Sequence, residues 1–140
     1  MPTHLIFWPM LAVLAIPIFV LLLNAKRKSA DRLAGHVQAE AAINNTAWSL
    51  PVVLTSNALA NQFQLPIIFY ALCFILIHLN GVSQIALILC WLFAVSRWAH
   101  AIIHVTSNKV PLRLSTFLIG ALVLLMLFAI SIVTLAQYNV

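Results

Sequence analysis

The feature of this sequence that most constrains its fold is a succession of four long apolar runs. They cover residues 5–23, 52–79, 82–105 and 114–136, and a helix that crosses a bilayer needs about 20 apolar residues. Only 6% of the 140 residues are charged, whereas a soluble domain carries about 25%. We therefore predict an all-α integral membrane protein in which residues 1–140 form a single four-helix transmembrane domain.

The first apolar run is interpreted as a transmembrane helix rather than a secretory signal peptide. No basic residue precedes it, and it is longer than the roughly 15 apolar residues of a signal peptide. The second and third runs are joined by Asn80 and Gly81 alone. Such a short connection predicts that neighbouring helices are antiparallel.

The basic residues lie mainly in two polar connectors, 24–50 and 106–113. They are Lys26, Arg27, Lys28 and Arg32 in the first connector, and Lys109 and Arg113 in the second. By the positive-inside rule, both connectors are expected to be cytoplasmic and both termini external, in an inner or plasma membrane. The net charge of +5 therefore indicates orientation and contact with anionic membrane lipids. No nucleic-acid partner is predicted.

One charged residue lies inside an apolar run. Arg97 shares a helical face with His100 and His104. Around the helix axis, the direction of His104 differs from that of Arg97 by about 20°, and the direction of His100 by about 60°. Arg97 also lies eleven residues before Asn108, or roughly 16 Å along a helix. A cation at this depth is costly in hydrocarbon, so it is expected to face protein or a wet cavity. Two roles remain open: a hydrogen bond that fixes assembly, or a functional polar site.

The histidines and cysteines of the apolar runs do not predict a metal or redox centre. His100 and His104 have the i, i+4 spacing that two ligands on one helix need, but no third ligand accompanies them. Both carboxylates, Asp31 and Glu40, lie in the first connector. Cys73 and Cys90 lack the spacing of a redox pair and are predicted to be buried apolar residues.

Amide side chains form a second polar feature, in the second apolar run. Asn57, Asn61 and Gln64 fall within about 60° of one another on a continuous helix, whereas Gln62 lies off that face. Amides within the membrane commonly hold helices together. The stripe is expected to face protein, at a depth where it can meet Arg97.

Several of these motifs together resemble the MAPEG family, the membrane-associated proteins in eicosanoid and glutathione metabolism. The resemblance rests on Arg97-Trp-Ala-His100, the following His104, SNKVPLR at 107–113, NQFQLPIIFY at 61–70 and the apolar fourth run. It covers residues 50–135, and it includes the number and orientation of the helices.

The resemblance implies a homotrimer that binds glutathione between subunits, in the cytoplasmic half of the membrane. Arg97 and His100 match the family's Arg-x-x-His and would hold the tripeptide. Arg113 matches a catalytic arginine that stabilises the glutathione thiolate. A thiol has a pKa of about 8.5, and a nearby cation favours its ionised, nucleophilic form. Further candidate ligand contacts at the same depth are His104, Asn57, Asn61 and Gln62.

The sequence also departs from the pattern of the family's enzymes. In helix 2 the enzymes carry Arg, Asn and Glu where this chain has Ala58, Leu59 and Gln62. In helix 3 they carry Tyr where it has His104, and in helix 4 they carry Ser and Tyr where it has Leu114 and Phe117. Two functions are therefore expected as alternatives. One is a glutathione transferase or peroxidase that acts on lipophilic small molecules, and the other is a non-catalytic lipid-binding protein or accessory subunit of a larger membrane complex.

Overall fold

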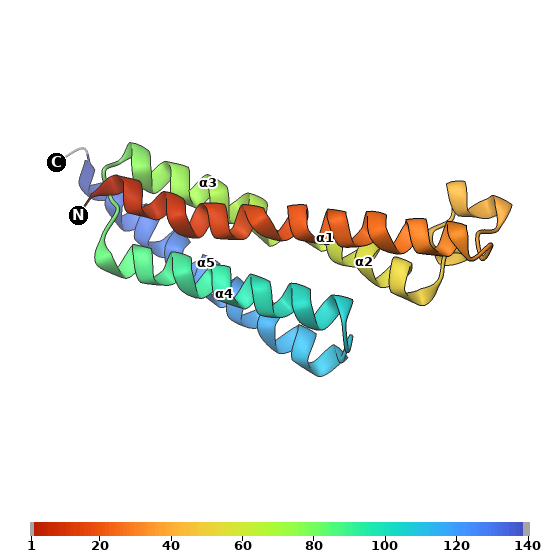
Figure 1. Ribbon diagram of the computed structural model, residues 1–140. Coiled ribbons are helices and arrows are strands. Elements are labelled where there is room, and N and C mark those ends of the chain that lie inside the picture. The colour runs from red at the N-terminus through yellow and green to blue at the C-terminus, as the bar shows by residue number, and fades with distance from the viewer. Residues whose placement is uncertain (1, 139–140) are drawn as a thin grey trace.

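The computed structural model describes residues 2–138, which form an elongated bundle of helices without a strand (Figure 1). The long helices are α1 (Phe7–Leu33), α2 (Leu50–Asn61), α3 (Leu65–His78), α4 (Gln84–Val105) and α5 (Val110–Tyr138). Three short 3₁₀ turns are η1 (Thr3–Ile6), η2 (Ala39–Ala42) and η3 (Asn45–Ala47). With α2 and α3 counted as one span, the described residues contain four segments long and apolar enough to cross a membrane. The predicted all-α membrane fold is confirmed.

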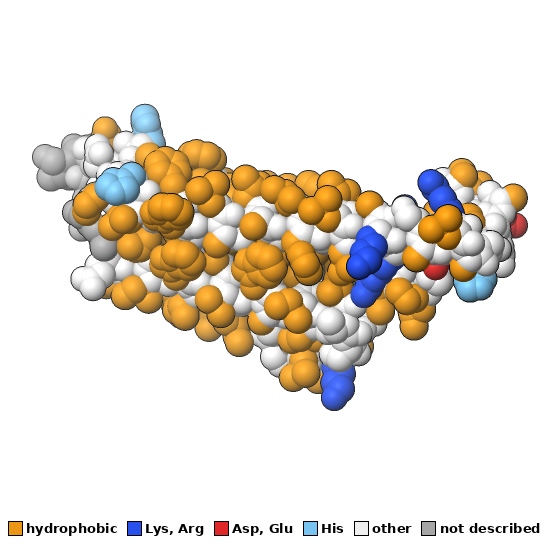
Figure 2. Space-filling view, in the orientation of Figure 1, with side chains coloured by type: hydrophobic (Ala, Val, Ile, Leu, Met, Phe, Trp, Pro, Cys, Tyr) orange, Lys and Arg blue, Asp and Glu red, His pale blue; other side chains and the backbone are white. Residues whose placement is uncertain are grey.

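The bundle has two chemically different ends. At one end η1 lies beside the last turn of α5, and at the other lie the connection from α1 to α2 and the turn from α4 to α5 (Figure 1). We call the latter the connector end. In the space-filling view, Lys and Arg gather toward the connector end, and apolar side chains cover most of the remaining face (Figure 2). This is the surface that a lipid-embedded bundle presents.

Helix α1 extends ten residues beyond the predicted span of 5–23, as far as Leu33. At 1.5 Å per residue it is about 40 Å long, which exceeds the roughly 30 Å hydrocarbon core of a bilayer. The extension is rich in Ala, Lys and Arg, which favour helices in water. It ends where Gly35 adopts a φ of 71° and the His36 N–H donates to the Asp31 carbonyl. The predicted connector 24–50 is therefore helical over its first part, because hydropathy marks the membrane boundary and not the helix end.

The second span is not the continuous helix predicted for residues 52–79. Helix α2 ends at Asn61 and α3 begins at Leu65, with Gln64 in a non-helical conformation at φ −100° and ψ −98°. Pro66 accounts for the break, because it has no N–H to donate to the Gln62 carbonyl and its ring would clash with that carbonyl in a continuous helix. This correction matters for function because the break lies beside the polar face of α4.

Glycines allow close contacts with α5 at the α3–α4 turn and midway along the α4–α5 packing. A Cβ on Gly81 would lie 2.5 Å from Thr134 Cγ2, and a Cβ on Gly120 would lie 3.2 Å from Ser96 Oγ. The Asn80–Gly81 turn joins α3 and α4, which run in opposite directions (Figure 1), but α4 packs mainly on α5 and α1, and α3 packs mainly on α5. The two helices are therefore not the closely packed neighbours that the short connection predicts. The close approach at Gly120 brings the first turns of α5 against the polar half of α4.

At the connector end, side chains of α1 bind its neighbours. Arg27 donates to the carbonyls of Pro51 and Val105 at 2.9 and 3.0 Å, which joins α1 to the start of α2 and the end of α4. The Asp31 carboxylate accepts from both the N–H and the hydroxyl of Ser49. Arg27, expected as an orientation signal and a contact for anionic lipids, therefore also holds α1 to α2 and α4.

Candidate functional site

The polar face of α4 is buried at the connector end of the bundle. Arg97, His100 and His104 are 1%, 4% and 2% exposed, so the structure places all three on one buried face as their spacing predicts. Arg97 lies eight residues before Val105, the last residue of α4. This places it about 12 Å along the helix from its end.

The Arg97 guanidinium uses an acceptor that the break in the second span creates. Its Nη2 lies 3.5 Å from the carbonyl oxygen of Asn61, which in a continuous helix would accept from the N–H of Leu65. The Nε and Nη1 atoms have no hydrogen-bond partner among the described residues. Because both carboxylate side chains of the chain lie in the first connector, this buried cation has no acidic side chain beside it.

His100 joins α4 to the first turns of α5. Its Nδ1 lies 3.1 Å from the Arg113 carbonyl oxygen and 3.2 Å from Thr116 Oγ1. A carbonyl only accepts, so Nδ1 carries the proton in this contact. In the neutral imidazole, Nε2 is then an acceptor, and it is buried without a partner among the described residues. His104 lies beside it, with ring centroids 6.0 Å apart.

Arg113 is held by the turn that precedes α5. Its Nη1 donates to Asn108 Oδ1 at 2.6 Å, while its Nε is buried and has no partner in the described part of the chain. Since His100 Nδ1 contacts the carbonyl of the same residue, Arg113 is held through both its side chain and its backbone. Most of its N–H groups remain available to a ligand.

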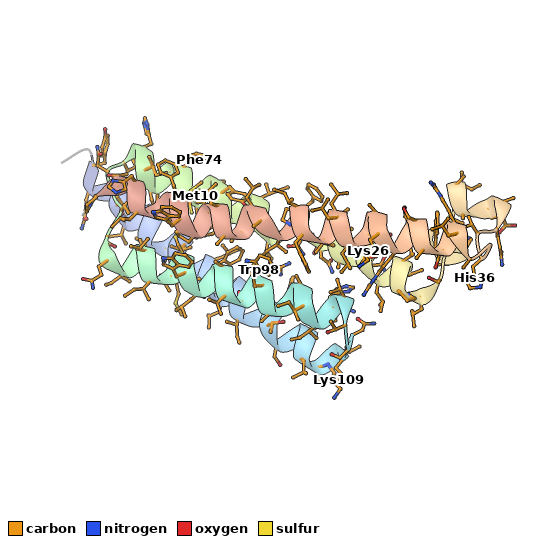
Figure 3. All side chains as sticks on the ribbon, in the orientation of Figure 1. Met10, Lys26, His36, Phe74, Trp98 and Lys109 are labelled. Atoms are coloured by element: carbon orange, nitrogen blue, oxygen red, sulfur yellow. The ribbon has the colours of Figure 1, made fainter. Side chains whose placement is uncertain are left out.

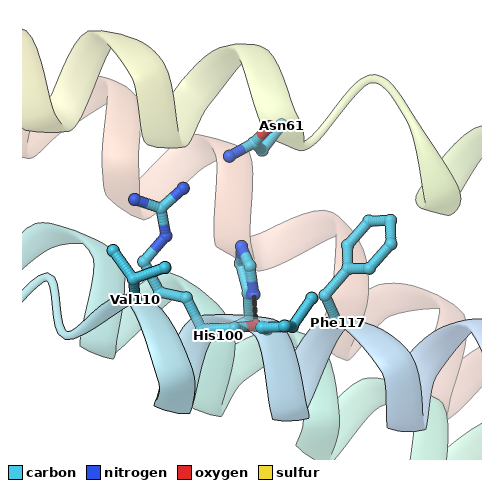
Figure 4. Close-up of a pocket in the computed structure, with 6 residues that line it drawn as sticks. Asn61, His100, Val110 and Phe117 are labelled. Carbon is cyan, nitrogen blue, oxygen red and sulfur yellow. Dashed lines mark hydrogen bonds between the residues drawn. The ribbon is translucent and has the colours of Figure 1, made fainter.

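Of these side chains, His100 and Arg113 line a cavity of about 390 Å³ between α2, α4 and α5. Its wall consists of Asn61, His100, Val110, Arg113, Leu114 and Phe117. In Figure 4, Asn61 projects from α2 toward His100, and Val110 and Phe117 lie on either side of His100. The wall therefore combines polar and cationic side chains with apolar ones.

The buried side-chain atoms that lack a hydrogen-bond partner belong to the polar face of α4 and its neighbours, and among their residues His100 and Arg113 line the cavity. Within residues 2–138 they are Gln62 Oε1, Arg97 Nε and Nη1, His100 Nε2, His104 Nδ1 and Arg113 Nε. An unsatisfied buried polar atom costs about 1–3 kcal/mol. Such a concentration in one region indicates a place where water or a polar ligand completes the hydrogen bonding.

The amides are arranged differently from the predicted stripe. Asn61 lines the cavity, but Asn57 is exposed and accepts from Asn45, and Gln64 is exposed as well. Gln62, predicted to lie off the stripe, is the buried amide, and its Nε2 donates to the Ala58 carbonyl. Gln64 therefore does not continue the predicted stripe, because the turn after Asn61 ends the helical period on which the stripe was based, whereas Asn57 and Asn61 both lie in α2.

Asn108 and Thr116 contact the candidate residues but were not identified from the sequence. Asn108 adopts a φ of 49°, and asparagine is one of the few residues that tolerate this left-handed conformation. An Asn placed after an apolar helix and before Pro111 was an available signal for such a turn. No comparable signal marked Thr116, whose hydroxyl is one helical turn from the Leu112 carbonyl that it binds.

The cavity does not offer a metal site of ordinary composition. In the part of the chain that the structure describes, no three His, Cys, Asp or Glu side chains lie close enough to share a metal ion. The side chains at the cavity are instead suited to a ligand that carries negative charge.

The four apolar spans, with a partly cationic pocket between α2, α4 and α5, define an integral membrane protein of the small helical-bundle class. The family model for the MAPEG family matches residues 5–133, and the chain belongs to that family. No curated protein and no solved structure matches it.

Proposed function

We propose that this protein binds glutathione in the cavity between α2, α4 and α5 and joins its thiol to lipophilic electrophiles. The observation that carries the proposal is the concentration of unpartnered buried atoms on Gln62, Arg97, His100, His104 and Arg113. Two of these residues are cations without an acidic partner. An anionic peptide would supply the missing acceptors.

Glutathione suits the polar part of this site. It carries two carboxylates, and an Arg guanidinium binds a carboxylate through two parallel hydrogen bonds. The Nε and Nη1 atoms of Arg97 have no partner in the described residues. Their free N–H groups lie on different edges of the guanidinium, so each would donate to a separate acceptor. The glutathione ammonium group needs an acceptor, and the unpartnered atoms able to accept are Gln62 Oε1, His100 Nε2 and, when Nε2 of that ring carries the proton, His104 Nδ1.

Arg113 is the proposed catalytic residue. A guanidinium beside the glutathione sulfur favours the thiolate, which is the nucleophilic form of a thiol. The sulfur then attacks an electrophilic carbon, a C–S bond forms, and the leaving group departs with the electron pair of its former bond. The thiol proton passes to water at the connector end. Val110, Leu114 and Phe117 supply an apolar wall against which a lipophilic electrophile would pack.

We further propose a homotrimer in an inner or plasma membrane, with connectors 24–50 and 106–113 cytoplasmic and both termini external. In support, Lys26 and Lys109 lie toward the connector end, whereas Met10 and Phe74 lie toward the opposite end of the bundle (Figure 3). The basic connectors together at one end satisfy the positive-inside rule. Contact between subunits would also cover exposed amides such as Asn57 and Gln64.

A second candidate function is non-catalytic binding of a lipid, alone or within a larger membrane complex. The observation that favours it is the absence of ligand-type side chains at Ala58 and Leu59, where the family's enzymes carry Arg and Asn. The apolar Leu114 and Phe117 in the cavity wall support the same alternative. A lipid with an anionic headgroup would use the two arginines in the same way.

Thermal unfolding in mild detergent, with and without glutathione, tests the proposal. A ligand at a hundred times its dissociation constant stabilises the folded state by about 2.7 kcal/mol. S-methylglutathione serves as the control that keeps the carboxylates and removes the thiol. Conjugation of glutathione to chlorodinitrobenzene and reduction of a lipid hydroperoxide then test catalysis. Stabilisation without turnover would favour the non-catalytic function, and no stabilisation would refute glutathione binding.

A further inference from the structure

We propose that Asn108 is a positioning residue for Arg113, whose guanidinium it orients toward the cavity without neutralising its charge. The proposal deepens the proposed function and rests on it for the identity of the ligand. Asn108 does not line the cavity itself. Its role would be to act through Arg113, which lines the cavity.

The backbone of Asn108 is fixed to the end of α4. Its N–H donates to the Ile103 carbonyl at 2.7 Å, and its φ of 49° reverses the chain direction there. The amide side chain is therefore anchored on a helix that also carries Arg97 and His100. An acceptor fixed in this way defines a direction for the group that binds to it.

Arg113 binds that acceptor with one nitrogen and leaves the others free. The 2.6 Å contact joins Nη1 to Asn108 Oδ1, and the unpartnered Nε is on the same rigid, planar guanidinium. The residue's carbonyl is bound by His100 Nδ1. His100 of α4 thus restrains the backbone of Arg113, and Asn108 in the following turn restrains its guanidinium. A charged group needs this preorganisation to stabilise a developing anion.

Asn108 also carries no charge, and this matters for Arg113. An amide oxygen accepts a hydrogen bond and leaves the positive charge of the guanidinium available for an anion. A carboxylate in the same place would form an ion pair with Arg113 and compete with the ligand. Asparagine and aspartate are nearly the same size and both tolerate positive φ, so this comparison can be made by a single substitution.

Three variants separate geometry from charge and from backbone effects. Asn108→Gly keeps the left-handed turn and removes the acceptor, and Asn108→Asp keeps the acceptor and adds a negative charge. Asn80→Gly is the matched control, since Asn80 has a φ of 52° in the hairpin at the other end of the bundle. All three are compatible with the native backbone, so their folding is expected to match that of the wild type.

The first measurement uses the ligand-free protein. Nitrogen NMR of arginine-labelled protein reports rotation about the Nε–Cζ bond, with the Arg113 signal assigned by its loss in Arg113→Lys. We expect slow rotation in the wild type, in Asn108→Asp and in Asn80→Gly, and faster rotation in Asn108→Gly. Unchanged rotation in Asn108→Gly would overturn the inference, whatever the ligand of the cavity is.

The second measurement is glutathione binding and turnover. We expect Asn108→Gly to lower turnover about tenfold, because misoriented catalytic groups are costly, and Asn108→Asp to weaken binding although its guanidinium stays restrained. If the wild type binds glutathione and both variants match it, the positioning role is refuted. If the wild type binds none, the proposed function fails, while the NMR comparison still decides whether Asn108 restrains Arg113.

Discussion

The Arg97 guanidinium lies 3.5 Å from the carbonyl oxygen of Asn61, the last residue of α2. This contact connects a buried cation of α4 to the break in the second span. The carbonyl is available because Leu65 begins a new helix instead of continuing the old one. The Nε and Nη1 atoms of Arg97 have no partner in the described residues, so this buried cation makes only part of the hydrogen bonds that it could make.

The first prediction concerns the stability that the protein loses because donors of the buried Arg97 have no hydrogen-bond partner among the described residues. Arg97→Met should raise the stability of the ligand-free protein by about 1–3 kcal/mol, because it replaces an unpartnered buried cation with an apolar side chain. The same variant should lose stabilisation by glutathione. Thermal unfolding in detergent measures both effects. Arg27→Met is the matched control and should destabilise the protein, since Arg27 donates to two backbone carbonyls. A destabilised, unassembled Arg97→Met protein would instead indicate a structural role.

The second prediction concerns the helix break. Pro66→Ala restores an N–H and removes the ring clash, so we expect the turn at 62–64 to become more helical. The Asn61 carbonyl would then pair within the helix, and binding at the cavity should weaken. Hydrogen exchange should slow at the amides of residues 64–66. Pro51→Ala is the control, because Pro51 lies in the first turn of α2, where proline is compatible with a helix. Equal effects of the two substitutions would contradict this account of the break.

The third prediction concerns the contact between α3 and α4. The Sγ atoms of Cys73 and Cys90 are 3.8 Å apart and both residues are buried, which confirms the burial predicted for them. A disulfide needs an S–S distance of about 2.05 Å, so a small movement suffices for a cross-link. Mild oxidation with iodine should yield a product lighter by two hydrogens, as measured by intact mass. Cys90→Ser should prevent it. Two alkylatable thiols after oxidation would show that this register is wrong.

The fourth prediction concerns membrane topology. In a background without Cys73 and Cys90, a cysteine at Ser29 should label from the cytoplasmic side and one at Gln137 from the outside. Both positions are exposed in the structure. A membrane-impermeant maleimide applied to intact and to opened cells makes the comparison. Labelling of both cysteines from the same side would be incompatible with four spans.

The broad architecture could be predicted from the sequence because it depends on sums over long windows. The cost of placing a charged or polar segment in hydrocarbon adds up residue by residue, so four spans and their order follow from the apolar runs. The shared face of Arg97, His100 and His104 follows from the period of an uninterrupted helix. Both predictions agree with the structure, since α4 is continuous through all three residues.

The details of the candidate site depend on where a helix ends and on which residues of the neighbouring helices face it. The turn before Pro66 ended the helical period after Asn61, and it buried Gln62 while leaving Gln64 exposed. The contacts of Arg113 with Asn108 and His100 join two helices and the turn between them. A helical period relates residues of one continuous helix only. The distances between helices, and therefore the partners of each buried polar atom, are set by packing among all of them, which only the tertiary structure decided.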